Sequence, residues 1–93
     1  MVHVVAYDLK TPNDTSEDYA RVISAIKLTY PTWAHVEQSV WLIETMQDAG
    51  TVRETLESYL NAKDVLFVGR LSGNWSTWNA GDKRNNWLHA RTF

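Results

Sequence analysis

Near its N-terminus the chain has a short segment, Val2 to Tyr7, in which nearly every residue is apolar and which stops at Asp8. Successive side chains of a β-strand point to opposite faces of the sheet. A strand that is apolar on both faces is typical of the middle of a sheet, or of a sheet whose second face is covered. The segment therefore predicts a buried strand whose last carboxylate stands at the end of the sheet.

The next segment has the spacing of an amphipathic helix. Apolar residues recur at i, i+3, i+4, i+7 and i+11, which places them on one helical face: Tyr19, Val22, Ile23, Ile26 and Tyr30. Thr15 and Asp18 have the spacing of a capping box at the start of this helix, and Pro31 predicts its end.

Residues 33–45 are mostly β-branched and aromatic, but the stretch is too long for one ordinary strand. We expect a hairpin that turns at residues 37–39. In that hairpin Ala34 and Val36 share a face with Val40 and Leu42, whereas Trp41 and Ile43 lie on the other face.

A second helix and a last strand follow. Thr51 and Glu54 match a second capping box, and the apolar stripe of the helix consists of Val52, Leu56, Tyr59 and Leu60. The run at residues 65–68 is continuously apolar, which predicts a strand buried on both faces.

This order of elements predicts an α+β fold of the ferredoxin-like type, βαββαβ, over residues 1–71. Its four-stranded antiparallel sheet would carry both helices on one face. Residues 72–93 form a Trp-rich, basic C-terminal extension. Its apolar patch at residues 87–90 can add a fifth strand, which would pair with the sheet edge of a neighbouring subunit.

Composition adds an expected partner and an expected location. Five Trp and four Tyr are many for 93 residues, and a small monomer can hide only some of them, so we expect a homodimer. The chain has no Cys, hence neither a disulfide nor a zinc–thiolate site. No apolar run approaches the length of a membrane span. We therefore expect a soluble, cytoplasmic protein without a membrane partner.

The charge is unevenly distributed. Residues 1–71 carry six Lys or Arg against ten Asp or Glu, whereas the extension carries Lys83, Arg84 and Arg91 against Asp82. An acidic body does not favour broad phosphate binding. If nucleic acid binds, the basic extension or a groove between subunits must supply the positive charge.

The extension also offers aromatic residues on which nucleic-acid bases could stack, Trp75, Trp78 and Trp87, with the three cations between and after them. We therefore consider this segment a candidate surface for a nucleic acid or a protein partner. In the other interpretation, these rings pack over the sheet or across a dimer interface.

Asp8 is the candidate catalytic residue. On a dimer axis, two copies of its carboxylate could share one Mg²⁺, a cation that prefers carboxylate and water oxygens. In the alternative interpretation, Asp8 only accepts backbone N–H bonds in the loop. His3 and His35 have no third ligand at metal spacing, so we interpret them as ordinary sheet or interface histidines.

Several of these motifs together resemble one known family. Tyr7-Asp8-Leu9 ends the first strand, residues 38–41 read Gln-Ser-Val-Trp in the hairpin, and residues 63–68 form the last strand. In this order and spacing they are similar to the CRISPR-associated Cas-two family. The stand-alone relatives labelled SinR-like are the nearest match, because Ser-Gly-x-Trp at residues 72–75 also fits them. The resemblance covers roughly residues 1–78.

The resemblance implies a homodimer whose sheets face each other, with Asp8 of each subunit near the dyad. It implies that Asp8 binds a divalent metal such as Mg²⁺ for cleavage of DNA or RNA. In the acquisition complex such proteins are instead a non-catalytic scaffold for duplex DNA, together with other CRISPR-adaptation proteins. Lys10 is the basic residue that follows the aspartate, where DNA-binding members carry cations.

Two alternatives remain open. In the first, the chain is a non-catalytic, ferredoxin-like dimer that binds its partner through the Trp-rich extension. In the second, it is closer to the virulence-associated protein D ribonucleases, which share the fold class, and its substrate is RNA.

Overall fold

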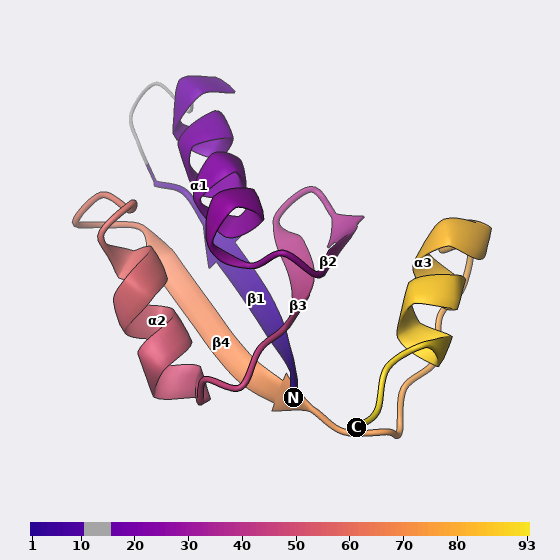
Figure 1. Cartoon of the computed structure of the whole chain (residues 1–93). Coiled ribbons are helices and arrows are strands. Elements are labelled where there is room, and N and C mark those ends of the chain that lie inside the picture. The colour runs from indigo at the N-terminus through magenta and orange to yellow at the C-terminus, as the bar shows by residue number, and fades with distance from the viewer. Residues whose placement is uncertain (11–15) are drawn as a thin grey trace.

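The computed structural model describes residues 1–10 and 16–93, and it has an α+β architecture. The elements follow in the order β1 (Val2–Asp8), α1 (Ser16–Thr29), β2 (Trp33–Glu37), β3 (Val40–Glu44), α2 (Ala49–Glu57), β4 (Val65–Leu71) and α3 (Gly81–His89). The strands form one antiparallel sheet of four strands in the order β2-β3-β1-β4 (Figure 1). The predicted α+β class and four-stranded antiparallel sheet are confirmed. Within the described residues, no helix is both long and apolar enough to cross a membrane.

The first strand lies in the middle of the sheet, as its apolar pattern predicts. Val5 of β1 stands opposite Trp41 of β3 on one side and Val68 of β4 on the other. Val2 and Val5, which point to opposite faces, are both fully buried. Each face of β1 is therefore covered over part of its length.

The helices α1 and α2 cover one face of the sheet, which we call the first face. The predicted stripe of α1 is confirmed, because Val22, Ile26 and Tyr30 are buried there and Tyr19 and Ile23 pack against them. The other buried members of this core come from β1, the loop after it, α1, β3 and α2: Val5, Tyr7, Leu9, Ala25, Trp41, Ile43, Val52 and Leu56.

A buried hydrogen bond orients two aromatic side chains in this core. The indole Nε1 of Trp41 donates to the Tyr7 hydroxyl at 3.1 Å. Burial raises the pKa of Tyr7 above its usual value, and the bond from Trp41 opposes that shift. The Tyr7 hydroxyl thus gives Trp41, a fully buried residue, a partner for its one polar atom.

The predicted hairpin is also confirmed. β2 and β3 are joined by a turn at residues 38–39, and a β-bulge lies between His35 and Glu37. Ala34 and Leu42 belong to the core on the second face of the sheet, while Trp41 and Ile43 belong to the first. The alternation read from the sequence therefore assigns these faces correctly.

The predicted start of α2 is wrong, because the N-cap is Asp48 rather than Thr51 and lies earlier in the chain. The helix begins at Ala49, and its N-cap is Asp48, whose Oδ1 accepts a hydrogen bond from the Thr51 backbone N–H at 2.8 Å. Thr51 is thus inside the helix, and the proposed box with Glu54 does not form the cap. Asp is as good a cap as Thr, and Gly50 is tolerated within the first turn. In the other predicted box, Thr15 lies outside the described residues.

A second correction concerns β4, which is buried on one face only. Because β4 is an edge strand, only β1 lies beside it. Val65 and Phe67, which point to the second face, are 54% and 63% exposed. The apolar run therefore indicates a strand, as predicted, but it does not indicate burial on both sides.

The third correction concerns the extension. Residues 87–90, the predicted fifth strand, belong to α3 and the residue that caps it. Arg84, Trp87, Leu88 and Arg91 recur at i, i+3, i+4 and i+7, which is a helical spacing. The apolar residues alone are too few to show this period, because two of the four positions that face the sheet are arginines.

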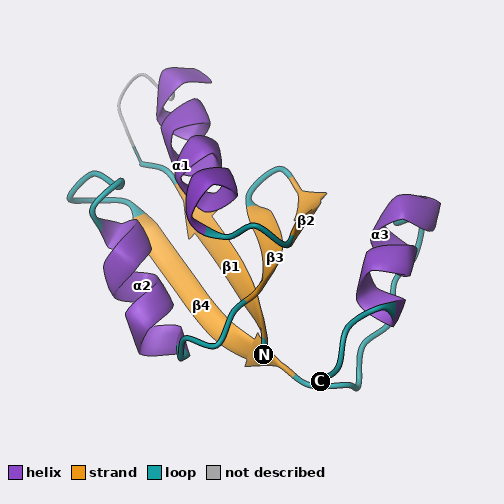
Figure 2. Cartoon of the chain, in the orientation of Figure 1, coloured by secondary structure: helices purple, strands orange, loops and turns teal. Residues whose placement is uncertain are grey.

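α3 packs against the second face of the sheet, on the side opposite α1 and α2 (Figures 1 and 2). Leu88 is buried against Val2, Ala34 and Leu42, and Trp75 and Phe93 are partly buried beside it. This second core lies over β2, β3 and one end of β1. The extension thus covers part of the face that a ferredoxin-like dimer would use.

The packing of α3 predicts the effect of removing its anchor. In Leu88→Ala we expect the free energy of unfolding to fall by about 2–4 kcal/mol, because a buried Leu is lost and a cavity remains. Leu28→Ala is the matched control, since Leu28 is 87% exposed, and it should change stability by less than about 0.5 kcal/mol. Urea unfolding followed by circular dichroism measures both. Equal stability of the two variants would contradict the packing of α3.

Candidate functional site

Asp8 is the last residue of β1 and stands opposite Val65 of β4. Its side chain is 62% exposed, and it lies on the second face of the sheet, as Ala6 does, because Val5 and Tyr7 point to the first. The sequence prediction that Asp8 stands at the sheet's end rather than in the core is confirmed.

Lys10 forms an ion pair with Asp8. The Lys10 ammonium donates to Asp8 Oδ2 at 2.7 Å, and both side chains are exposed. The hydrogen bond to Asp8 and its negative charge raise the pKa of Lys10 above the ordinary value. Lys10 therefore already serves as a cation beside the candidate carboxylate.

A second aspartate joins the loops at this end of the sheet. Asp64 accepts hydrogen bonds from the backbone N–H of Lys10 at 2.7 Å and of Asn61 at 2.8 Å. The loop after β1 is thereby tied to the loop before β4. Asp64 thus has the structural role that we considered as the alternative for Asp8.

The described part of a single chain offers no cluster of metal ligands at Asp8. Among the described residues, no three His, Cys, Asp or Glu side chains lie close enough together to hold a metal ion. Mg²⁺ takes six oxygen ligands, several of which are commonly waters, and Asp8 supplies at most two. The arrangement considered in the sequence analysis, in which two Asp8 carboxylates share one Mg²⁺, would take its second carboxylate from another copy of the chain.

The two histidines of the sheet contact other groups of the fold, but among the described residues His3 Nδ1 is a buried nitrogen without a hydrogen-bond partner. His3 is buried, and its Nε2 lies 2.8 Å from the Gln47 carbonyl. The His35 ring stacks on Trp41, with centroids 3.9 Å apart and an angle of 9° between the planes. They are not part of a metal site among the described residues.

The aromatic residues of the extension divide into two classes. Trp75 is partly buried in the second core, with its ring centroid 5.2 Å from that of His89. Trp78 is 89% exposed. The interpretation of these rings as packing over the sheet is therefore confirmed for Trp75, and Trp78 is available to a partner.

The three cations of the extension also differ. Arg91 donates to Glu44 at 3.1 Å, and its guanidinium carbon lies 4.6 Å from the centre of the Trp87 ring. Arg84 is held by two carbonyls, since its Nε donates to His35 O at 2.6 Å and its Nη1 to Ala80 O at 3.0 Å. Lys83 is exposed and makes no ion pair within the described part of the chain.

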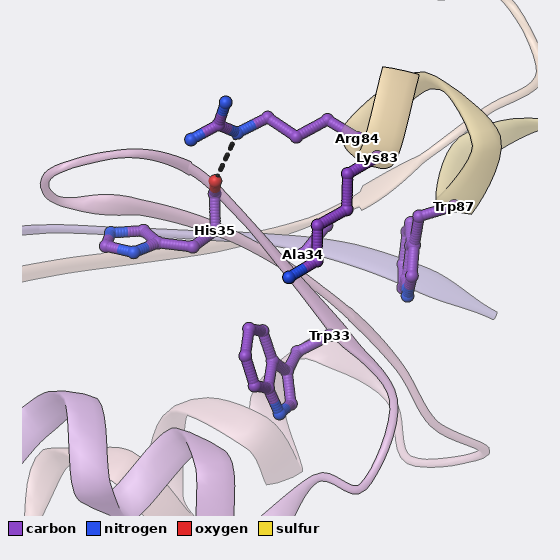
Figure 3. A pocket seen from close by; sticks show the side chains of 6 residues that line it. All are labelled: Trp33, Ala34, His35, Lys83, Arg84 and Trp87. Carbon is purple, nitrogen blue, oxygen red and sulfur yellow. Dashed lines mark hydrogen bonds between the residues drawn. The ribbon is translucent and has the colours of Figure 1, made fainter. Parts of the chain in front are cut away.

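A pocket of about 200 Å³ lies between α3 and β2 (Figure 3). Its lining consists of Trp33, Ala34, His35, Lys83, Arg84 and Trp87. Two of the predicted binding residues, Lys83 and Arg84, therefore meet here. Asp8, Lys10, Trp75, Trp78 and Arg91 do not line it.

The contributions of Trp33 and His35 to this pocket are absent from the sequence interpretation, which includes Trp87 among the rings of the extension. Trp33 and His35 belong to β2, about fifty residues before the helix that faces them, as the 49-residue separation of Arg84 and His35 shows. The sequence carries no pattern that pairs these segments. The tryptophans were visible as aromatic residues, but their neighbours were not.

A scan against models of known protein families finds none that matches the chain. The resemblance to the Cas-two family therefore remains a hypothesis that rests on the motifs quoted above.

The ion pair at the end of β1 gives a direct prediction. In Asp8→Asn the pKa of Lys10 should fall back toward its ordinary value, because the charge that raises it is removed. A pH titration followed by NMR at the lysine side chain measures it. Asp64→Asn is the control, since Asp64 binds the Lys10 backbone and not its ammonium.

The sign of the pH effect follows from the same pair. A lysine whose pKa is raised in the folded chain favours folding at lower pH, and this contribution is lost as the pH rises past the raised pKa. Because both groups are exposed, the effect on stability should be slight. An unchanged Lys10 pKa in Asp8→Asn would show that the pair does not exist in solution.

Proposed function

We propose that the chain is a ferredoxin-like homodimer of the Cas-two or SinR-like kind that handles nucleic acid. The order of strands and the position of α1 and α2 on one face are consistent with the ferredoxin-like fold. The nucleic acid, RNA or DNA, and the partnership with CRISPR-adaptation proteins come from the resemblance. The dimer and the role of Asp8 have support in the described residues.

The observation that carries the proposal is an uncovered apolar strip beside Asp8. α3 covers the part of the second face over β2 and β3, and it leaves Phe67 and Val65 of β4 exposed. Ala6 stands opposite Phe67, and Asp8 stands opposite Val65. We call Ala6, Val65 and Phe67 the open strip.

A second copy is the occupant that best fits the open strip. A two-fold dimer uses the same patch on both subunits, so apolar side chains meet apolar side chains. Because Asp8 stands at the end of the strip, a dyad through this part of the sheet would bring the two Asp8 carboxylates together. Gly69 leaves room for the Phe67 ring on this face. A Cβ at position 69 would lie 3.1 Å from Phe67 Cε1.

The paired carboxylates would give the proposed centre its chemistry. A divalent cation held there supplies Lewis-acid activation of a phosphodiester and of water. Lys10, which is paired with Asp8 here, would be available to bind a phosphate oxygen if a metal took its place at the carboxylate. The proposed enzyme is thus a metal-dependent endonuclease that requires both subunits.

A specific observation also favours the non-catalytic alternative. The pocket between α3 and β2 joins aromatic and cationic side chains at a distance from the open strip. A dimer that binds nucleic acid through the extension needs no chemistry at Asp8. The two functions differ in whether Asp8 is required.

The dimer is tested at the open strip. Phe67→Glu places a charge in the proposed interface, so the variant should sediment as a monomer while the parent chain sediments as a dimer. Circular dichroism should show that its fold is unchanged, because the side chain is exposed in the single chain. Leu28→Glu, on the exposed side of α1, is the control and should stay dimeric. A dimer in both variants would rule out this interface.

The enzymatic part is tested by cleavage of RNA and DNA with Mg²⁺ or Mn²⁺. Asp8→Asn should lower cleavage to the level of a metal-free control while the dimer persists. Phe67→Glu should also remove cleavage, because the carboxylates no longer meet. Asp64→Asn should retain it. If the parent chain cleaves neither polymer, the enzymatic proposal fails and the non-catalytic alternative stands.

A further inference from the structure

We infer that the pocket between α3 and β2 is a nucleotide-binding site, in which one base lies against the tryptophans and its phosphate is bound by Lys83 and Arg84. Only the class of ligand, a nucleic acid or one of its nucleotides, rests on the proposed function. It requires neither Asp8 nor a second copy. Four observations support it: the aromatic walls, the anchored arginine, the open lysine and the size of the pocket.

The aromatic walls are held in place from outside the pocket. Lys27 Nζ lies 4.9 Å from the centre of the Trp33 ring, and the Arg91 guanidinium carbon lies 4.6 Å from that of Trp87. Trp33 also makes an edge contact with Trp41, with centroids 5.2 Å apart. Rings that are fixed before a ligand arrives lose little entropy when a base stacks on them.

Arg84 is preorganised to bind an anion. Its bonds to the His35 and Ala80 carbonyls use two of the five N–H groups of the guanidinium. The remaining donors belong to a side chain whose position is already fixed, and planar donor pairs match phosphate oxygens well. Arg84 thus links the edge strand β2 to α3 and also supplies positive charge.

Lys83 is the second cation of the pocket, and no acidic side chain in the pocket lining pairs with it. Its amino group points toward the space that Trp33, His35 and Trp87 surround (Figure 3). No Asp or Glu lines the pocket. The ammonium therefore has no carboxylate neighbour there, and a phosphate would complement its charge.

The position of these cations in α3 is unfavourable for the helix alone. Lys83 and Arg84 lie in its first half, near the N-terminus, where the helix dipole favours acidic residues. The N-cap, Ala80, has no side-chain hydrogen bond to offer there. A local choice that opposes stability is typical of a functional site.

The size of the pocket selects the ligand further. Pockets for drug-sized ligands have volumes of about 300–1,000 Å³, and this one has about 200 Å³. It is therefore suited to one planar ring system rather than to a large ligand. An acidic peptide would satisfy the cations but would leave the two indoles without an aromatic partner.

The test is a titration with AMP and with a short single-stranded oligonucleotide, each without divalent cations, followed by tryptophan fluorescence and calorimetry. We expect both to bind and to quench the fluorescence, and we expect adenosine and ribose phosphate to bind more weakly than AMP. Lys83→Ala should weaken AMP binding about tenfold, because a charge-assisted hydrogen bond is lost. Trp33→Leu should remove the quenching and the preference for AMP over ribose phosphate.

The matched control is Lys63→Ala, an exposed lysine outside the pocket lining, which should bind AMP like the parent chain. Binding of the oligonucleotide but not of AMP would also support the site and identify a base within a strand as its ligand. If Lys83→Ala binds AMP as the parent chain does, or if ribose phosphate binds as well as AMP, the inference is overturned. The titration contains no divalent cation and therefore does not depend on the proposed nuclease. AMP binding here, together with no cleavage of RNA or DNA in the separate assay with Mg²⁺ or Mn²⁺, would overturn only the enzymatic proposal.

Discussion

β1 has apolar side chains on both of its faces, and the rest of the structure depends on how the two faces are covered. Burial of apolar surface is the main term that favours folding, so a central strand of this kind needs a layer on each side. α1 and α2 provide one complete layer. On the other side the chain provides only α3 and the residues around it, which leave the β4 edge uncovered.

This incomplete second layer produces both candidate sites. Where it ends, Val65 and Phe67 remain exposed beside Asp8, and a second copy can complete the cover. Where α3 meets the edge strand β2, side chains from two distant segments enclose a small pocket. The proposed paired Asp8 centre and the proposed nucleotide site would thus lie at two boundaries of one layer, and neither would need the other.

The charge distribution fits this arrangement. The acidic body does not attract nucleic acid over its whole surface, but Lys83 and Arg84 concentrate positive charge at the pocket, and Lys10 stands beside Asp8. The proposed binding at these places would rely on a few directed contacts rather than on a broad basic surface. Arg91, by contrast, is committed to Glu44 and Trp87, so its contribution is to hold α3 on the sheet.

The sequence by itself determined the strands, the two main helices and the faces of the hairpin, because alternation and helical period are local properties of the chain. It also placed Asp8 at the end of β1. Only the tertiary structure decided that residues 87–89 are helical, since Arg84 in α3 and Arg91 just after it complete the spacing with which this segment meets the sheet. It alone brought Trp33 and His35 to Lys83 and Trp87, because contacts between segments so far apart depend on packing and leave no periodic trace in the sequence. Likewise the exposure of Phe67 follows from where the second layer ends, which no pattern within β4 reveals.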